Sequence, residues 1–128
     1  MMMLTIGEIL SLHDKLIAAT GGMPGLRDMG LLESAIYSPN AGFGDDEQYP
    51  TIQEKAARLA YSLTMNHAFN DGNKRIGMYA MLVTLDLNSI HLAYTQRELI
   101  DLGLGVADGS VGYDAILVWI KEHNASLN

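Results

Sequence analysis

The sequence predicts an all-α fold, a compact bundle of about six helices with a small flap or hairpin near residues 40–50. Three observations support this fold class. Apolar residues recur at helical spacing in successive segments, Thr followed three residues later by Glu marks helix starts, and glycine or proline separates the segments. The 128 residues are enough for one hydrophobic core but too few for two, so we expect a single domain over residues 1–128.

The first two predicted helices precede the flap. Apolar periodicity predicts an amphipathic helix from Thr5 to about Thr20, ended by Gly21-Gly22. After a short loop, Asp28 stands where an N-cap is expected, and a helix follows that stops before Pro39. One face of this second helix is apolar and is expected to pack on the core: Leu31, Leu32, Ala35 and Ile36.

The composition of residues 40–50 predicts an exposed loop or small hairpin. They combine the acidic run Asp45-Asp46-Glu47 with two glycines and the aromatic residues Phe43 and Tyr49. Two interpretations carry equal weight. The segment is either a solvated connection or a lid or docking flap, since such loops often have binding functions.

The third and fourth helices flank the segment that holds most of the reactive side chains. Thr51 and Glu54 have capping-box spacing, which predicts a helix that runs to about His67. Another helix is expected from about Asn73 through Leu85. It is apolar nearly all round beyond its first turn, which is typical of the central helix of a bundle.

The last two helices follow an irregular link at residues 88–94, with a strand-like piece at residues 90–92. Thr95 and Glu98 repeat the capping-box spacing and predict a helix to about Ala107. Asp108-Gly109-Ser110 interrupts the pattern, and a final helix is expected from about Tyr113 to His123.

Composition narrows the functional classes. A net charge of −7 argues against broad binding to DNA or RNA, because neutralising phosphates needs many clustered cations. Composition does not exclude the binding of a small anion at one local site. The chain has no cysteine, which fits a reducing compartment, and no basic leader or long uninterrupted apolar run. We therefore expect a cytoplasmic protein that does not contact membranes.

The stretch from His67 to Arg75 concentrates the chemistry of the chain. It reads His-Ala-Phe-Asn-Asp-Gly-Asn-Lys-Arg, and its last two residues are the one adjacent pair of basic residues in the sequence. If a helix begins near Asn73, its free N–H groups and dipole favour a bound phosphate. Gly72 would let the backbone approach the anion and adopt positive φ, and the charges of Lys74 and Arg75 would add to the attraction.

Two further side chains suit phosphoryl transfer. Asp71 offers an oxygen ligand for Mg²⁺ shared with phosphate, and His67 can accept a proton from an attacking hydroxyl. Phe69 is expected to anchor the loop in the core. Each residue also has a structural explanation, because helix ends, turns and caps commonly use these residue types. His13, His91 and His123 are interpreted as surface or packing residues.

The stretch closely resembles the signature of the Fic/Doc superfamily, His-x-Phe-x-(Asp/Glu)-(Gly/Ala)-Asn-(Gly/Lys)-(Arg/Lys), and within it the death-on-curing (Doc) branch. In that branch a Lys follows the Asn, as Lys74 does here, where the AMP-transferring Fic branch has Gly. Fic enzymes also have a second Arg at the position of Met78. Gly72 is the residue typical of the Fic branch, and this position does not distinguish the two branches. The segment Gly25-Leu26-Arg27-Asp28-Met29-Gly30-Leu31-Leu32-Glu33-Ser34-Ala35 resembles the upstream part of the family.

The resemblance implies a kinase toxin of a toxin–antitoxin system, one that uses ATP and Mg²⁺ to phosphorylate a Thr or Ser of elongation factor Tu and so stops translation. His67 would be the general base and Asp71 the metal ligand. Lys74 would act in catalysis and, with Gly72, Asn73 and Arg75, would hold the phosphates.

Partners and alternatives also follow from the resemblance. The flap would dock the target protein, and a Phd-type antitoxin would inhibit the toxin, because the internal inhibitory motif of many Fic enzymes is absent from the sequence. The alternatives are an AMP transferase of the Fic type and a non-catalytic module that binds an anion or an antitoxin.

Overall fold

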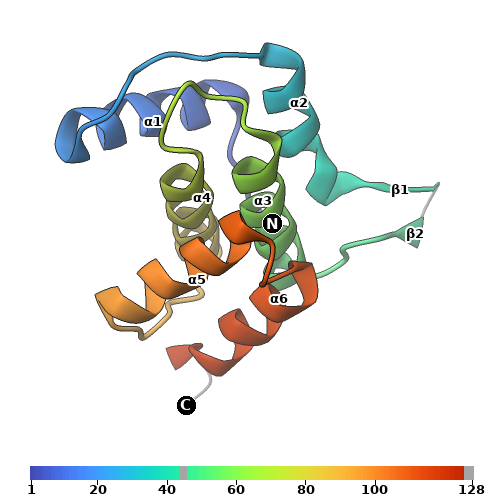
Figure 1. The fold of residues 1–128 in the computed structure, drawn as a ribbon. Helices are drawn as coiled ribbons and strands as arrows, with labels where there is room; N and C mark the ends of the chain where they lie inside the picture. Colours follow the sequence, from blue (N-terminus) through green and yellow to red (C-terminus); the bar gives the residue numbers. More distant parts are fainter. Residues whose placement is uncertain (44–45, 126–128) are drawn as a thin grey trace.

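A computed structural model describes residues 1–43 and 46–125 and confirms the all-α fold. Within these residues six α-helices form the bundle, and two very short strands form a hairpin (Figure 1). The elements are α1 (Ile6–Thr20), α2 (Met29–Tyr37), the 3-10 helix η1 (Ser38–Asn40), β1 (Gly42–Phe43), β2 (Asp46–Glu47), α3 (Ile52–Asn66), α4 (Asn73–Leu87), α5 (Gln96–Asp108) and α6 (Tyr113–Glu122).

Capping interactions set the helix ends close to the predicted positions. Thr51 and Thr95 each form a capping box with the Glu three residues later, and the Asp28 side chain accepts a hydrogen bond from the first turn of α2. Gly21 ends α1, and Gly109 ends α5 with a left-handed backbone. These boundaries depend on local sequence, which is why they could be predicted.

The most extensive helix contact in the bundle is between α3 and α4, which lie side by side at its centre (Figure 1). A Cβ atom at Gly77 of α4 would lie 2.3 Å from the hydroxyl oxygen of Thr64 and 2.9 Å from the carbonyl oxygen of Ala60, both on α3. Only glycine therefore fits at this crossing. The small side chains of Ala56, Ala57 and Ala60 on α3 are fully buried, which is consistent with the close approach.

The central helix is α3 more than α4, which corrects the prediction. α3 contacts α2, α4, α5 and α6, whereas α4 keeps an open side on which Tyr79 is 45% exposed and Leu87 is 40% exposed. The apolar side chains of α4 are more numerous than its neighbouring helices can cover. Part of its apolar surface instead lines a groove.

The core has two parts on opposite sides of the central pair. One part joins α3 and α4 to α1 and α2, and the other joins them to α5 and α6. The fully buried side chains of the first part include Ile9, Leu32, Leu63 and Ile76, and those of the second include Met81, Leu85, Val106, Ile116 and Ile120. No helix of the described residues is long and apolar enough to cross a membrane.

The predicted flap is a hairpin that projects from the bundle (Figure 1). β1 and β2 pair antiparallel, with Gly42 opposite Glu47, while Asp45 of the predicted acidic run lies outside the described residues. The buried ammonium of Lys55 on α3 contacts the Pro39 carbonyl oxygen at 3.1 Å and the Glu47 carboxylate at 3.4 Å. α3 therefore anchors the base of the hairpin.

The strand-like piece predicted at residues 90–92 is reduced to one isolated bridge, between Leu92 and Asn124. The link between α4 and α5 is otherwise irregular. The alternation of apolar residues at positions 90 and 92 reflects packing against the second part of the core.

The contact at Gly77 predicts that a single methyl group is costly there. Gly77→Ala is expected to lower the free energy of unfolding by about 1–3 kcal/mol through overpacking, although alanine is the better helix former. Urea denaturation followed by circular dichroism measures the change.

Gly7→Ala is the matched control, because a Cβ at this helical position would have its nearest neighbour at 4.0 Å. This variant should be neutral or slightly stabilising. Equal tolerance of the two substitutions would contradict the proposed role of Gly77.

Candidate active site at the start of α4

The loop that joins α3 to α4 runs between two left-handed residues. His67 follows the last residue of α3 with φ 52° and ψ 47°, and Gly72 precedes α4 with φ 75° and ψ 19°. Between them Ala68 and Phe69 are buried, so Phe69 anchors the loop in the core as predicted. A left-handed conformation is uncommon for a histidine and needs support from its surroundings.

That support comes from the segment before α2. The backbone N–H groups of Arg27 and Asp28 both donate to the Ala68 carbonyl oxygen, at 2.8 and 3.0 Å. The N–H of Asn70 donates to the Gly25 carbonyl oxygen at 3.0 Å. The upstream segment that carries the family resemblance therefore lies against the loop and holds its backbone.

His67 presents an exposed imidazole with a fixed backbone. Its carbonyl oxygen accepts hydrogen bonds from the Arg27 guanidinium, through Nε at 2.8 Å and also through Nη2. This cation lies at the carbonyl end of α3, where positive charge is favourable. The ring itself makes no hydrogen bond to any residue that the structure describes, so it is available to a substrate.

Asp71 is held as an ionised carboxylate beside the start of α4. Its Oδ2 accepts a hydrogen bond from the Met23 N–H at 3.0 Å, and its Oδ1 accepts one from the Gly72 N–H at 2.8 Å. Arg75 lies 3.6 Å away. The two backbone N–H groups, and to a smaller extent Arg75, hold the pKa of Asp71 below its usual range.

The first turn of α4 has no side-chain cap. The N-cap residue is Gly72, which has no side chain to supply an acceptor, so the N–H groups of this turn lack a capping side chain. A Cβ at Gly72 would lie 3.1 Å from Ile17 Cδ1, and the positive φ also favours glycine. An uncapped helix start with cations beside it suits an anion.

Asn73 supports the loop with its side chain. Its Oδ1 accepts a hydrogen bond from the Phe69 N–H and its Nδ2 donates to the Phe69 carbonyl oxygen, both at 3.0 Å. The prediction that Asn73 holds phosphate therefore rests on its backbone, because its side-chain amide is already engaged.

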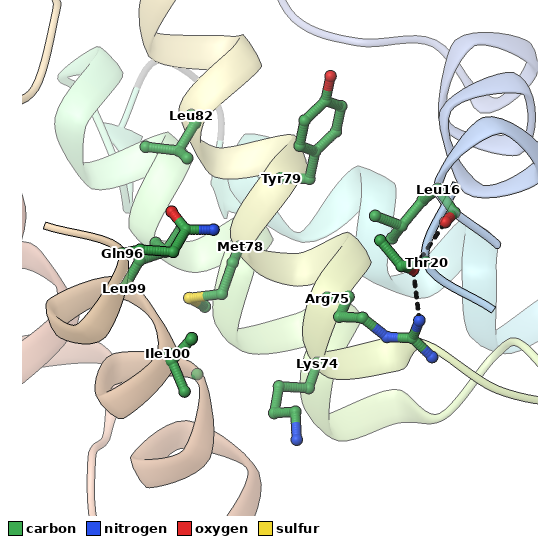
Figure 2. Close-up of a pocket in the computed structure, with 11 residues that line it drawn as sticks. Leu16, Thr20, Lys74, Arg75, Met78, Tyr79, Leu82, Gln96, Leu99 and Ile100 are labelled. Atoms are coloured by element: carbon green, nitrogen blue, oxygen red, sulfur yellow. Dashed lines mark hydrogen bonds between the residues drawn. The ribbon is translucent and has the colours of Figure 1, made fainter. Parts of the chain in front are cut away.

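Arg75 and Lys74 leave the helix start in different directions (Figure 2). The Arg75 guanidinium donates to the Thr20 hydroxyl at 2.6 Å and to the Gly21 carbonyl oxygen at 2.8 Å, at the end of α1. The Lys74 stem runs along α5, where a Cβ at Gly103 would lie 3.1 Å from Lys74 Cγ. The structure thus brings Asp71, Gly72 and Arg75 together, while the ammonium of Lys74 lies toward α5.

Both cations border an apolar groove between α1, α4 and α5 with a volume of about 290 Å³ (Figure 2). Its other lining residues are mostly apolar and include Leu16, Met78, Tyr79, Leu82, Leu99 and Ile100. The groove begins at the start of α4 and continues along its exposed stripe.

The loop offers a divalent metal ion one carboxylate, that of Asp71. The described residues contain no cluster of three or more His, Cys, Asp or Glu side chains that could hold a metal by themselves. A single carboxylate fits Mg²⁺ that takes its remaining ligands from phosphate oxygens and water. The donor set is therefore compatible with a metal–nucleotide complex.

Two residues that contact the loop were not among the predicted site residues. Arg27 binds the His67 carbonyl oxygen. His13, predicted to be a surface or packing residue, is buried and binds the Asp71 carbonyl oxygen. His13 shares the apolar stripe of α1 with Ile9 and Ile17 at intervals of four residues. That spacing indicates burial, but nothing local indicates its partner.

Comparisons with known proteins agree with the resemblance seen in the sequence. The sequence model of a family described as Fic/DOC family matches residues 3–85. The chain is 42% identical over 89 residues to a protein named Toxin Doc from Mycolicibacterium smegmatis, covering 67% of this chain and 68% of that protein. It is 31% identical over 109 residues to a protein named Protein kinase doc from Escherichia phage P1, covering 85% of each.

The uncapped start of α4 predicts that inorganic phosphate stabilises the protein. At about ten times the dissociation constant, linkage gives roughly 1.4 kcal/mol, which corresponds to a rise in Tm of about 5 °C. Arg75→Gln should remove most of this rise, because a charge beside the helix start is lost. Differential scanning fluorimetry across a phosphate titration at constant ionic strength measures it.

Arg97→Gln is the matched control. Arg97 also pairs with an Asp four residues away, Asp101 at 3.3 Å, but both are exposed side chains of α5. It should keep the full phosphate response. Equal responses in the two Arg variants would show that phosphate acts elsewhere.

Proposed function

This chain belongs to the Fic/DOC family, among its Doc toxins, and we propose that it is a protein kinase that transfers the γ-phosphate of ATP to a Thr or Ser hydroxyl of elongation factor Tu. In this proposal it acts in the cytoplasm, arrests translation, and is inhibited by a Phd-type antitoxin. The observation that carries the proposal is the uncapped, cation-flanked first turn of α4, which follows a short loop with the Asp71 carboxylate and the exposed His67.

The phosphates bind at the start of α4. Its free N–H groups and the positive end of its dipole face the phosphate oxygens, with Gly72 allowing close approach. Arg75 is already held in place by Thr20 and Gly21, so little side-chain freedom is lost when an anion binds. Lys74 can extend its ammonium from α5 toward the same phosphates.

Asp71 would hold Mg²⁺, and the metal would offset the negative charge that develops during transfer. The low pKa of Asp71 suits this role, because the carboxylate is ionised at neutral pH without a bound cation. Its two backbone hydrogen bonds also fix its direction.

His67 serves as the general base. It takes the proton of the attacking hydroxyl as the hydroxyl oxygen bonds to the γ-phosphorus atom. The bond from that phosphorus to the β–γ bridging oxygen breaks, and ADP leaves. Arg27 binds the His67 carbonyl oxygen and so supports the backbone that carries the ring.

Two residues favour phosphate transfer over AMP transfer. Lys74 stands where AMP-transferring Fic enzymes have Gly, and Met78, which is buried, stands where they have a second Arg. The similar phage P1 protein is named a protein kinase, which supports the same reading. The hairpin of β1 and β2 would present the target segment to the site.

Position-specific labelling tests the reaction. With elongation factor Tu and Mg²⁺, label from γ-³²P-ATP is expected to reach the target protein, and label from α-³²P-ATP is not. Removal of Mg²⁺ by chelation should abolish transfer. Transfer only from the α-labelled nucleotide would replace the kinase proposal with AMP transfer.

The requirement for His67 separates an enzyme from a binding module. His67→Ala is expected to lose growth arrest in expressing cells and to reduce transfer by at least about 100-fold, as loss of a general base does. Circular dichroism checks that the variant is folded.

His91→Ala is the control, since His91 lies in the link that follows the far end of α4. It should arrest growth like the unmodified protein. Undiminished arrest by His67→Ala would point to a non-catalytic module.

A further inference from the structure

His13 lies on α1 beneath the loop and contacts it in two ways. The side chain is almost completely buried, at 1% exposure. Its ring stacks on Phe69, with ring centroids 3.8 Å apart and an angle of 11° between planes. Its Nε2 lies 2.7 Å from the backbone carbonyl oxygen of Asp71. One side chain therefore contacts both the anchor of the loop and the proposed metal ligand.

The contacts assign the tautomer of His13. A carbonyl oxygen only accepts hydrogen bonds, so Nε2 must carry the hydrogen and donate. Nδ1 is buried and has no hydrogen-bond partner among the described residues. A hydrogen on Nδ1 would be a buried donor without an acceptor, which is unfavourable. The neutral Nε2–H form satisfies the site with one hydrogen bond.

This bond fixes the peptide group that joins Asp71 to Gly72. His13 binds the carbonyl oxygen of that peptide, and the Asp71 carboxylate binds its N–H. The plane of the peptide is thus held from both ends. Its orientation sets the direction of the Asp71 side chain on one side and the left-handed turn into α4 on the other.

The His13 ring lies close to the backbone of Gly72. A Cβ there would lie 3.5 Å from His13 Nε2, so the ring fits directly against the backbone of the turn. Phe69 stacks on one face of the imidazole and so helps to hold the ring in place. A partly buried bond of this kind is stronger than a fully exposed one.

We propose that His13 is a positioning residue for the transfer reaction: its Nε2–H holds the Asp71–Gly72 peptide and so aims both the Asp71 carboxylate and the first-turn amides of α4 at the phosphates. This inference rests on the proposed function. In this proposal His13 touches no reacting atom. Its effect is on geometry, to which transfer rates are sensitive.

Two variants of similar length separate the hydrogen bond from packing. In His13→Gln the amide N–H can take the place of Nε2–H, whereas His13→Met fills the space without a donor. His13→Met is expected to lower kcat for transfer by at least about tenfold, with a smaller change in KM for ATP. His13→Gln should stay within about threefold of the unmodified protein in kcat.

His123→Gln controls for the loss of a histidine hydrogen bond elsewhere. His123 stacks on Trp119 of α6 and bonds to Glu98, away from the loop. This variant should leave kcat unchanged. Equal losses of kcat in folded His13→Gln and His13→Met would overturn the proposal.

An NMR measurement tests the proposal without activity. Nitrogen-15 spectra of labelled histidine should show His13 as the Nε2–H tautomer, and the amide resonance of Gly72 should move in His13→Met and return in His13→Gln. An Nδ1–H tautomer, or an unmoved Gly72 resonance, would overturn the positioning role.

The kinetic and NMR experiments keep the kinase proposal and the His13 proposal separable. Absence of transfer by the unmodified protein would refute the kinase, while the NMR result would still decide whether His13 positions the peptide. If His13→Met does not fold, the tautomer in the unmodified protein and kcat of His13→Gln decide.

Discussion

The site depends on the close contact between α3 and α4 at Gly77. Because the two helices touch through Gly77, Ala60 and Thr64, they form a tight antiparallel pair, and the chain must reverse direction within the six residues of the loop. Such a short reversal is made with left-handed residues at both ends, His67 and Gly72. One consequence is an exposed imidazole at the end of α3, and the other is an α4 that starts without a side-chain cap. Helix packing thereby produces the elements of an anion site.

Several features of the loop cost stability and are compensated by neighbouring groups. A left-handed histidine is strained, a helix start without a cap leaves N–H groups unsatisfied, and cations beside it are unfavourable. The left-handed His67 is supported by the Arg27 guanidinium and by backbone hydrogen bonds between residues 25–28 and the loop. Asp71 and the end of α1 bind the Arg75 guanidinium, which offsets the unfavourable interaction of this cation with the dipole of α4. The unsatisfied amides remain, and a bound phosphate would satisfy them. Such a site would let an acidic protein bind a small anion at one position, although its net charge of −7 opposes the binding of polyanions.

Much of the fold could be predicted because it follows from neighbouring residues. Thr51, Thr95 and Asp28 cap their helices through side chains and N–H groups three residues apart, so the pattern in the sequence is itself the interaction. The burial of α4 was predicted less well. Its apolar residues suggest a helix surrounded on all sides, but Tyr79 faces an open groove, since burial depends on how many neighbours the fold supplies. The strand-like piece predicted at residues 90–92 is reduced to one bridge for a related reason. A short alternation of apolar residues does not specify a partner strand.

The sequence by itself determined which reactive residues share the turn from His67 to Arg75, where the flanking helices begin and end, and that this turn resembles the Fic/Doc signature. Only the tertiary structure decided what those side chains do. It engages the Asn73 amide with Phe69, sends Lys74 toward α5, and places Arg27 on the His67 carbonyl oxygen. It also buries His13 against a carbonyl oxygen 58 residues away along the chain. Capping and periodicity act over a few residues and leave their mark in the sequence, whereas these contacts arise only when α1 and the segment before α2 pack against the loop, and no local pattern records that packing.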